Sequence, residues 1–271
     1  MTARFARGPK SPKGRARLLN AVSFGALLLV WVALTADFGR GPLVAPLFLP
    51  SPQSVATTFA TLLRNGYQGE SLLHHLGMSL MRFGLGFSIA ALLAIPLGLW
   101  MGMNETVKGL CDPPIEITRP MPKLALLPLL IIWFGIGELS KVLIIVLALF
   151  PVLSISAMQA VRGVGLRKVQ AALALGASRG TVFRRVIFPA SLPGIFTGLR
   201  VSIGLGVTML VGAEMIATSD GIAWMALSAA DFLLTNVVLV GALIMAVLGY
   251  GLDLLARAVE NKVVHWGGRE G

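Results

Sequence analysis

Three ionisable side chains, Arg82, Arg200 and Glu214, lie inside long apolar stretches of this 271-residue sequence. A charged group at the centre of a bilayer costs about 2.5–3.5 kcal/mol, so it usually faces a bundle interior or a cavity. A guanidinium group suits planar or multidentate oxyanions. We therefore expect Arg82 or Arg200 either to meet an acid within a helix bundle or to face the anionic headgroup of a substrate in a translocation pathway.

Glu214 lies between small residues near the end of its apolar stretch. It could line an outer gate, or it could form a hydrogen bond with a neighbouring helix. Arg200 and Glu214 are roughly 21 Å apart along an ideal helix, so one residue cannot pair with both. Asp253 and Arg257 are four positions apart, which favours a local helix pair without a transport role.

A second candidate for function is the basic segment 162–190, which separates two apolar blocks. Its sequence predicts a first short helix with a small-residue face, a break at glycine, and a second short helix over 181–187 that ends at proline. Small side chains let a partner's backbone approach closely, so the pattern suits a protein socket. An ordinary cytoplasmic loop is the alternative. The candidate contact residues are Gln170, Ala171, Ala172, Gly176, Ala177 and Pro189.

Composition places the chain in a membrane, because 56% of the residues are hydrophobic and only 13% are charged. The net charge of +11 lies in tails and loops rather than along one soluble face, which argues against nucleic-acid binding. The single cysteine, Cys111, can form no internal disulfide, and its neighbours match no metal-ligand spacing. No phosphate-binding Gly-x-x-x-x-Gly-Lys-Ser/Thr motif occurs, so we do not expect this chain to hydrolyse ATP or to be an enzyme.

Apolar blocks predict an all-α integral membrane protein with about six transmembrane helices. The blocks cover about 18–36, 72–103, 110–134, 138–161, 192–217 and 232–259. We expect the first to be a retained helix rather than a cleaved signal peptide. The third is Pro-rich and discontinuous, and such backbone survives at membrane depth only against protein or water. The predicted divisions are a basic tail (1–18), a first helix with a periplasmic segment (19–71), a transmembrane core (72–260) containing the loop 162–190, and a C-terminal tail (261–271).

Charge predicts the orientation. The N-terminal tail, the segment 162–185 and the C-terminal end are rich in Lys and Arg, whereas the loop 217–231 carries Asp220 and Asp231. By the positive-inside rule, both termini face the cytoplasm. The same rule explains the basic residues of segment 162–185, so their charge indicates topology and not function.

The order of residues in that segment resembles the signature of the permease subunits of bacterial ABC importers. The matching pattern is Gln-Ala-Ala, three residues, Gly, nine residues, and Val-Ile-Phe-Pro. The family signature begins with glutamate, and Gln170 keeps its shape without its charge, which puts a salt bridge to an ATPase in doubt. Further runs resemble the taurine, sulfonate and nitrate branch of the family: 48–52, 119–122, 126–129, 132–138, 175–179 and 198–200.

This resemblance implies a type I ABC importer permease fold and a homodimer in the bacterial inner membrane. It also implies two ATP-binding subunits that hold ATP and Mg, a periplasmic or lipoprotein solute-binding protein, and no cofactor in this chain. The substrate would be taurine or a related small organosulfonate, with nitrate, longer alkanesulfonates and thiamine precursors as rivals. Transport would proceed by alternating access, with the residues around Gly176 touching the ATPase. An ATP-independent channel or facilitator is the alternative that composition alone would permit.

Overall fold

The computed structural model describes residues 13–37, 41–216 and 218–266, with side chains from residue 18 onward. The N-terminal tail predicted for 1–18 and the C-terminal tail predicted for 261–271 therefore lie partly outside the described residues. Within the described ranges the chain is helical apart from turns and two isolated β-bridges. The elements are α1 (Lys13–Thr35), α2 (Pro52–Asn65), α3 (Leu72–Met103), α4 (Glu105–Thr118), a 3₁₀ turn (Lys123–Leu126), α5 (Leu127–Phe134), α6 (Glu138–Arg162), α7 (Leu166–Ala174), α8 (Arg179–Val182), a π turn (Phe183–Ile187), α9 (Phe188–Ile216), α10 (Ile222–Asp231) and α11 (Thr235–Val263).

Five of the described helices are long and apolar enough to cross a bilayer: Leu18–Thr35, Leu72–Met103, Glu138–Arg162, Arg179–Ile216 and Thr235–Val263. The third predicted span, which brings the number to six, is a broken pair, α4 followed by residues 123–134, bent by 89°. The prediction of an all-α membrane protein with about six spans, one of them discontinuous, is confirmed. The bend follows the Pro-rich sequence around Pro120 and Pro122, because proline supplies no N–H to continue a helical ladder.

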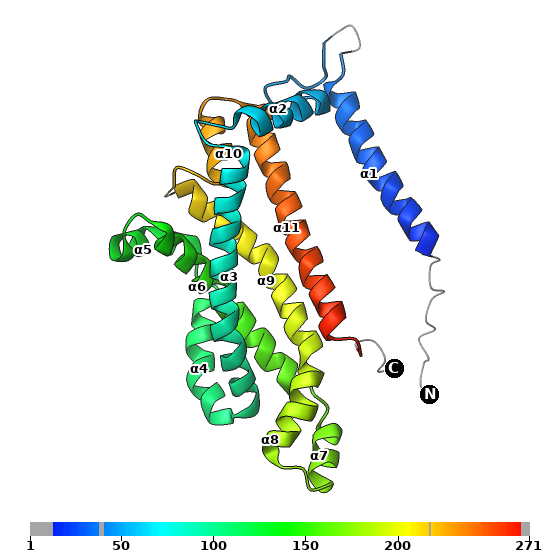
Figure 1. Ribbon diagram of the computed structural model, residues 1–271, viewed down its shortest axis with the longest axis vertical. Coiled ribbons are helices and arrows are strands. Elements are labelled where there is room, and N and C mark those ends of the chain that lie inside the picture. The colour runs from blue at the N-terminus through cyan, green and yellow to red at the C-terminus, as the bar shows by residue number, and fades with distance from the viewer. Residues whose placement is uncertain (1–12, 38–40, 217, 267–271) are drawn as a thin grey trace.

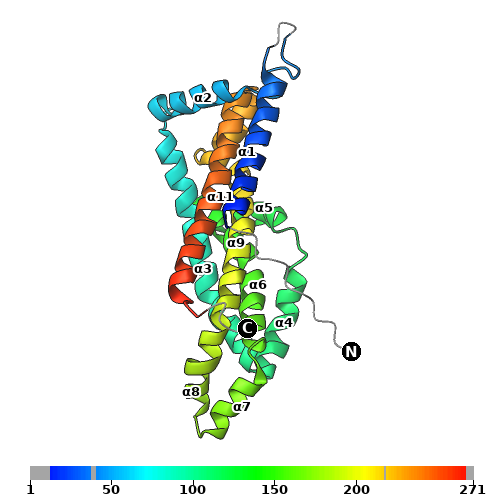
Figure 2. The ribbon, with the colours of Figure 1, turned by 90° about the vertical axis from the view of Figure 1, so that its right-hand side faces the viewer.

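Helix starts follow local capping chemistry. Ser51 accepts a hydrogen bond from the Ser54 N–H at 3.2 Å at the start of α2, and Ser71 accepts one from the His74 N–H at 3.1 Å at the start of α3. The amphipathic α2 lies across one end of the long helices (Figures 1 and 2).

A three-helix unit of α3, α6 and α9 forms the centre of the fold (Figure 1). Two-thirds of the α6 span is buried, whereas none of the α1 span is buried. Glycines allow the close approach: a Cβ on Gly98 of α3 would lie 2.2 Å from the Ser154 carbonyl oxygen of α6, and one on Gly198 of α9 would lie 2.4 Å from the Ser156 Cβ. Since no larger residue fits at these positions, the three helices pack as one body.

The two ends of the molecule carry different short elements. In Figures 1 and 2, α7 and α8 lie at one end of the long helices, and α2 lies at the opposite end, together with α10 in Figure 1. The end that carries α7 and α8 is called the coupling end here, and the other is called the outer end. The first residues of α1 and the last residues of α11 point toward the coupling end (Figure 1).

Candidate functional site

The predicted socket exists as two short helices, α7 and α8, that project from the coupling end (Figure 1). No residue of α7 is buried. Gln170, Ala171 and Gly176 are exposed, while Ala172 and Ala177 are half-buried. The chain enters this element from α6 and leaves it toward α9, so both of its connections lead into the central three-helix unit.

Gly176 provides the turn between the two short helices. Its φ of +81° lies in the left-handed region that favours glycine. The Gly176 N–H donates to the Leu173 carbonyl at 2.9 Å, and the Ala177 N–H donates to the Ala172 carbonyl at 3.1 Å. These two bonds form a Schellman motif that ends α7. The sequence-based expectation of a glycine break at this position is confirmed.

The expectation that Pro189 ends the second short helix is wrong. The chain is helical without interruption over Arg179–Ile216 and passes through both Pro189 and Pro193. The reason is the π turn over Phe183–Ile187, in which the Phe188 N–H donates to the Phe183 carbonyl. A π turn is wider than an α turn, so it relieves the clash between a proline ring and the carbonyl four residues earlier.

Arg82 is fully buried near the outer end and joins three separate parts of the chain. Its Nε donates to Glu138 Oε2 at 2.6 Å, and its Nη2 donates to Glu138 Oε1 at 2.9 Å. Its Nη1 donates to Glu214 Oε1 at 3.1 Å and to the Asp220 carbonyl at 3.0 Å. Nη2 also contacts the Thr218 hydroxyl and the Asp220 carboxylate. Because every N–H of the guanidinium is engaged, Arg82 meets acids within the bundle, which is one of the two arrangements that the sequence predicts.

Glu214 is also fully buried and accepts from two other elements. Its Oε1 accepts from the Ser79 hydroxyl at 2.7 Å, and its Oε2 accepts from the Ala223 N–H at 3.0 Å. Lys141 completes the cluster by donating to Glu138 at 2.8 Å. The acids of this cluster, Glu138, Glu214 and Asp220, outnumber its two cations, Arg82 and Lys141. An anionic substrate would have to displace these carboxylates to reach Arg82.

Asp220 lies in the turn before α10, outside the spanning helices. Its partial burial raises the pKa of its carboxyl, but hydrogen bonds from Arg82 and Thr218 and the charges of Arg82 and Lys141 lower it, and the net pKa lies below the ordinary 3.8. His74 approaches the same carboxylate at 3.6 Å. A lowered pKa in the folded state means that Asp220 stabilises the fold fully above pH 3.8 and loses this contribution as pH falls through the folded-state pKa.

This shift predicts a pH-dependent difference between the wild type and Asp220→Asn. The wild type should have the higher melting temperature near neutral pH, and the gap should shrink as pH falls below 3.8. Thermal unfolding of both proteins in detergent between pH 7 and 3 measures it. A gap that stays constant across this range would contradict the assigned charge role.

Arg200 lies far from this cluster and pairs with α11. Its Nε donates to Asp253 Oδ1 at 2.9 Å, and its Nη1 lies 3.6 Å from Glu260 Oε2. Asp253 also forms the predicted local pair with Arg257 at 2.7 Å. The structure therefore does not bring the three predicted pathway residues together: Arg82 and Glu214 share one cluster, and Arg200 belongs to another.

Sequence reasoning missed several members of the cluster around Arg82: His75, Ser79, Thr218, Asp220 and Glu138. His75 is fully buried, and its Nδ1 accepts from the Gly221 N–H at 3.1 Å. The sequence of α3 could have revealed part of this cluster, because positions 75, 79 and 82 carry polar side chains on one face of the helix. No comparable signal joins that face to Glu138 or Asp220, which lie far along the chain.

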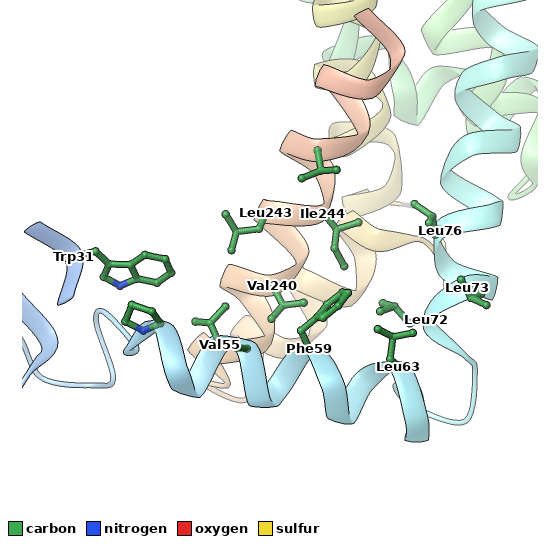
Figure 3. Close-up of a pocket in the computed structure, with 13 residues that line it drawn as sticks. Trp31, Val55, Phe59, Leu63, Leu72, Leu73, Leu76, Val240, Leu243 and Ile244 are labelled. Carbon is green, nitrogen blue, oxygen red and sulfur yellow. The ribbon is translucent and has the colours of Figure 1, made fainter. Parts of the chain in front are cut away.

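A groove between α2 and the long helices is a different kind of surface (Figure 3). It has a volume of about 540 Å³ and lies between α2 and parts of α3 and α11, with Trp31 of α1 at one end. The side chains that line it are apolar, including Val55, Phe59, Leu76 and Ile244. Since they offer no hydrogen-bond donor at its centre, the groove does not suit a sulfonate or nitrate ion.

Comparisons with known proteins agree with this architecture. Residues 94–265 match the family described as "binding-protein-dependent transport system inner membrane component". The chain is 42% identical to the taurine transport system permease protein TauC of Escherichia coli (strain K12), covering 95% of this chain and 92% of that protein. It is 34% identical to the putative aliphatic sulfonates transport permease protein SsuC of Bacillus subtilis (strain 168), covering 88% and 84%.

A solved structure of the MetNI methionine ABC transporter, in an inward-facing conformation, has the same fold. The TM-score is 0.61 at 16% identity, over 71% of this chain and 95% of that chain. The spanning helices, the exposed two-helix element and these relatives together identify the family of the chain. The chain belongs to the binding-protein-dependent transport system inner membrane component family and is a permease component of an ABC transporter, in the branch of the taurine and sulfonate permeases.

Proposed function

We propose that this chain is the membrane-spanning subunit of an ATP-driven importer for taurine or a related small organosulfonate. The observation that carries the proposal is the exposed α7–α8 element, whose two connections lead directly into the buried unit of α3, α6 and α9. The substrate class follows from the relatives named above.

Transport proceeds by alternating access in this proposal. A homodimer of the chain sits on two ATP-binding subunits, which hold ATP and Mg, and a solute-binding protein delivers the substrate at the outer end. Closure of the ATP-binding subunits pushes α7 and α8 and rotates the helices attached to them. The contact residues are Gln170, Ala171, Ala172, Gly176 and Ala177; Pro189 lies beyond them, in the helix that carries the motion. Gln170 contacts the partner through hydrogen bonds rather than a salt bridge.

Orientation follows from charge. The described coupling end carries Arg162, Arg167, Lys168, Arg179, Arg184 and Arg185 and is assigned to the cytoplasm by the positive-inside rule. The start of α1 and the end of α11 point toward this end (Figure 1), which supports cytoplasmic termini in the inner membrane of a bacterium.

A pathway role stays a prediction for Arg82, Arg200 and Glu214. The saturation of Arg82 by acids favours Arg200 as the residue that a passing anion would meet, because its side chain is partly exposed. If it does, Arg200→Gln should raise the apparent KM for uptake more than it lowers the maximal rate.

Copurification separates this function from an ATP-independent channel. The tagged chain, isolated from its own cells in mild detergent, should bring down an ATP-binding subunit. After reconstitution in lipid vesicles, the complex should transport solute only when ATP is present on the side of the membrane that carries the ATP-binding subunits. Uptake by the chain alone, down a gradient and without ATP, would establish the channel instead.

A further inference from the structure

The first turn of α10 is capped by side chains from two other helices. The first N–H groups of any α-helix lack partners within that helix. Here the Gly221 N–H donates to His75 Nδ1 at 3.1 Å, the Ile222 N–H to Ser79 Oγ at 3.0 Å, and the Ala223 N–H to Glu214 Oε2 at 3.0 Å. All three acceptors are fully buried, two on α3 and one on α9.

The caps are held in fixed orientations by the rest of the cluster. Since His75 Nδ1 accepts, its Nε2 carries the proton and faces the Tyr67 carbonyl at 3.3 Å. Ser79 accepts from Ile222 and donates to Glu214, so its hydroxyl direction is set. Arg82 fixes Glu214 from the other side. A change in any one member leaves a buried donor or acceptor without its partner.

The turn that begins α10 fits tightly against His75, Ser79 and Glu214, which are together called the cradle here, and Gly221 shows this most clearly. Its φ is +108°, and a Cβ there would lie 2.4 Å from the Glu214 carboxyl carbon. The turn therefore rests directly on the Glu214 carboxylate. Further along α10, Trp224 stacks on His75 at 5.7 Å between ring centroids, and Ser228 accepts from Gln68 Nε2 at 2.9 Å. These contacts bind α10 to the outer end of α3 and to the turn that precedes α3.

The cradle lies at the far end of the same helices that carry the coupling element. Close glycine contacts hold α3, α6 and α9 together, and α7–α8 is inserted between α6 and α9. Glu138, which holds Arg82 through two hydrogen bonds, is the first residue of α6. The central unit therefore connects α7 and α8 to the side chains that cap α10.

We propose that His75, Ser79 and Glu214, held by Arg82, are positioning residues that make α10 move with the central unit during transport. This inference rests on the proposed function, because it assigns the outer end of the alternating-access movement to α10. Loss of the caps would let α10 separate from the unit. ATP-driven movement at the coupling end would then no longer determine the position of α10 at the outer end.

The main test variant is Glu214→Gln in the assembled transporter, reconstituted in lipid. Gln keeps an oxygen for Ser79 and Arg82, but its NH₂ group faces the Ala223 N–H, so one cap is lost. Asp253→Asn is the matched control, because it weakens the ion pair of Asp253 with Arg200 between α9 and α11, and this pair touches no part of α10. Ser79→Ala is the second test variant, which removes the Ile222 cap without changing a charge.

The first measurement is hydrogen–deuterium exchange of the peptide that contains Gly221, Ile222 and Ala223. We expect exchange at least about tenfold faster in Glu214→Gln and Ser79→Ala than in the wild type, as for loss of one buried hydrogen bond, and no change in Asp253→Asn. Wild-type exchange rates in both test variants would overturn the capping arrangement.

The second measurement is the number of ATP molecules hydrolysed per solute imported. A merely structural defect lowers both rates together and leaves this ratio unchanged, whereas loss of positioning raises it several-fold. Faster exchange with an unchanged ratio would overturn the positioning role. If the wild type shows no ATP-driven uptake, the proposed function fails and the positioning role with it, while the exchange result still decides whether the caps exist.

Discussion

Replacing Arg82 with methionine is expected to destabilise the protein by about 3–5 kcal/mol, the cost of removing one partner from a buried ion pair. Met fills a similar volume but leaves the fully buried Glu214 without its guanidinium partner, and it also removes the guanidinium from Glu138 and Asp220. Unfolding in detergent, followed by fluorescence and by size-exclusion chromatography, measures the loss.

Arg119→Met is the matched control for this change. The Arg119 side chain is half exposed and pairs with Glu116 three residues earlier at 3.3 Å. Such a surface pair contributes about 0.2–1 kcal/mol, so this variant should behave nearly like the wild type. Equal losses in the two variants would show that Arg82 is not the centre of a buried network. Addition of Glu214→Gln to Arg82→Met should recover part of the stability, because it removes the uncompensated buried charge.

Replacing Gly176 with valine is expected to abolish most solute-stimulated ATP hydrolysis while leaving the membrane bundle folded. No heavy atom lies within 4 Å of a Cβ built at this position, so the fold has room for a side chain. The cost comes from the φ of +81°, which a β-branched residue avoids, and from the bulk added to the exposed partner face. The turn between α7 and α8 would be lost and the approach of the ATP-binding subunit blocked.

Gly180→Val is the control for the Gly176 change. Gly180 lies in α8 with similar free space but without a positive φ. Both variants should elute as folded protein, and only Gly176→Val should lose the response of ATP hydrolysis to loaded solute-binding protein. A full response in Gly176→Val would contradict the assigned coupling turn.

Local and compositional features could be predicted from the sequence. Hydropathy located the spans, the Pro-rich run marked the broken one, and Gly176 marked the turn between two short helices. These features depend on neighbours along the chain, and a single sequence reports them well. Resemblance to a motif then indicated the family, because the order of residue types in α7–α8, and not only their positive charge, matches the family signature.

Long-range and context-dependent features could not be predicted. The partners of Arg82 come from positions 56 to 138 residues away, and neither hydropathy nor charge says which acid meets which base. Pro189 was expected to stop a helix, yet a π turn in the preceding residues accommodates it. Nothing in the local sequence around His75 indicates its partner, and only the fold reveals that this side chain caps α10.

Uptake of labelled taurine in the source organism under sulfur limitation tests the central claim most directly. We expect deletion of the gene to abolish uptake, the intact gene to restore it, and the Gly176→Val gene to fail. Unlabelled alkanesulfonate, nitrate and a thiamine precursor, added as competitors, define the substrate within the branch. Taurine uptake that is unchanged by the deletion would contradict the account and assign the permease to another solute.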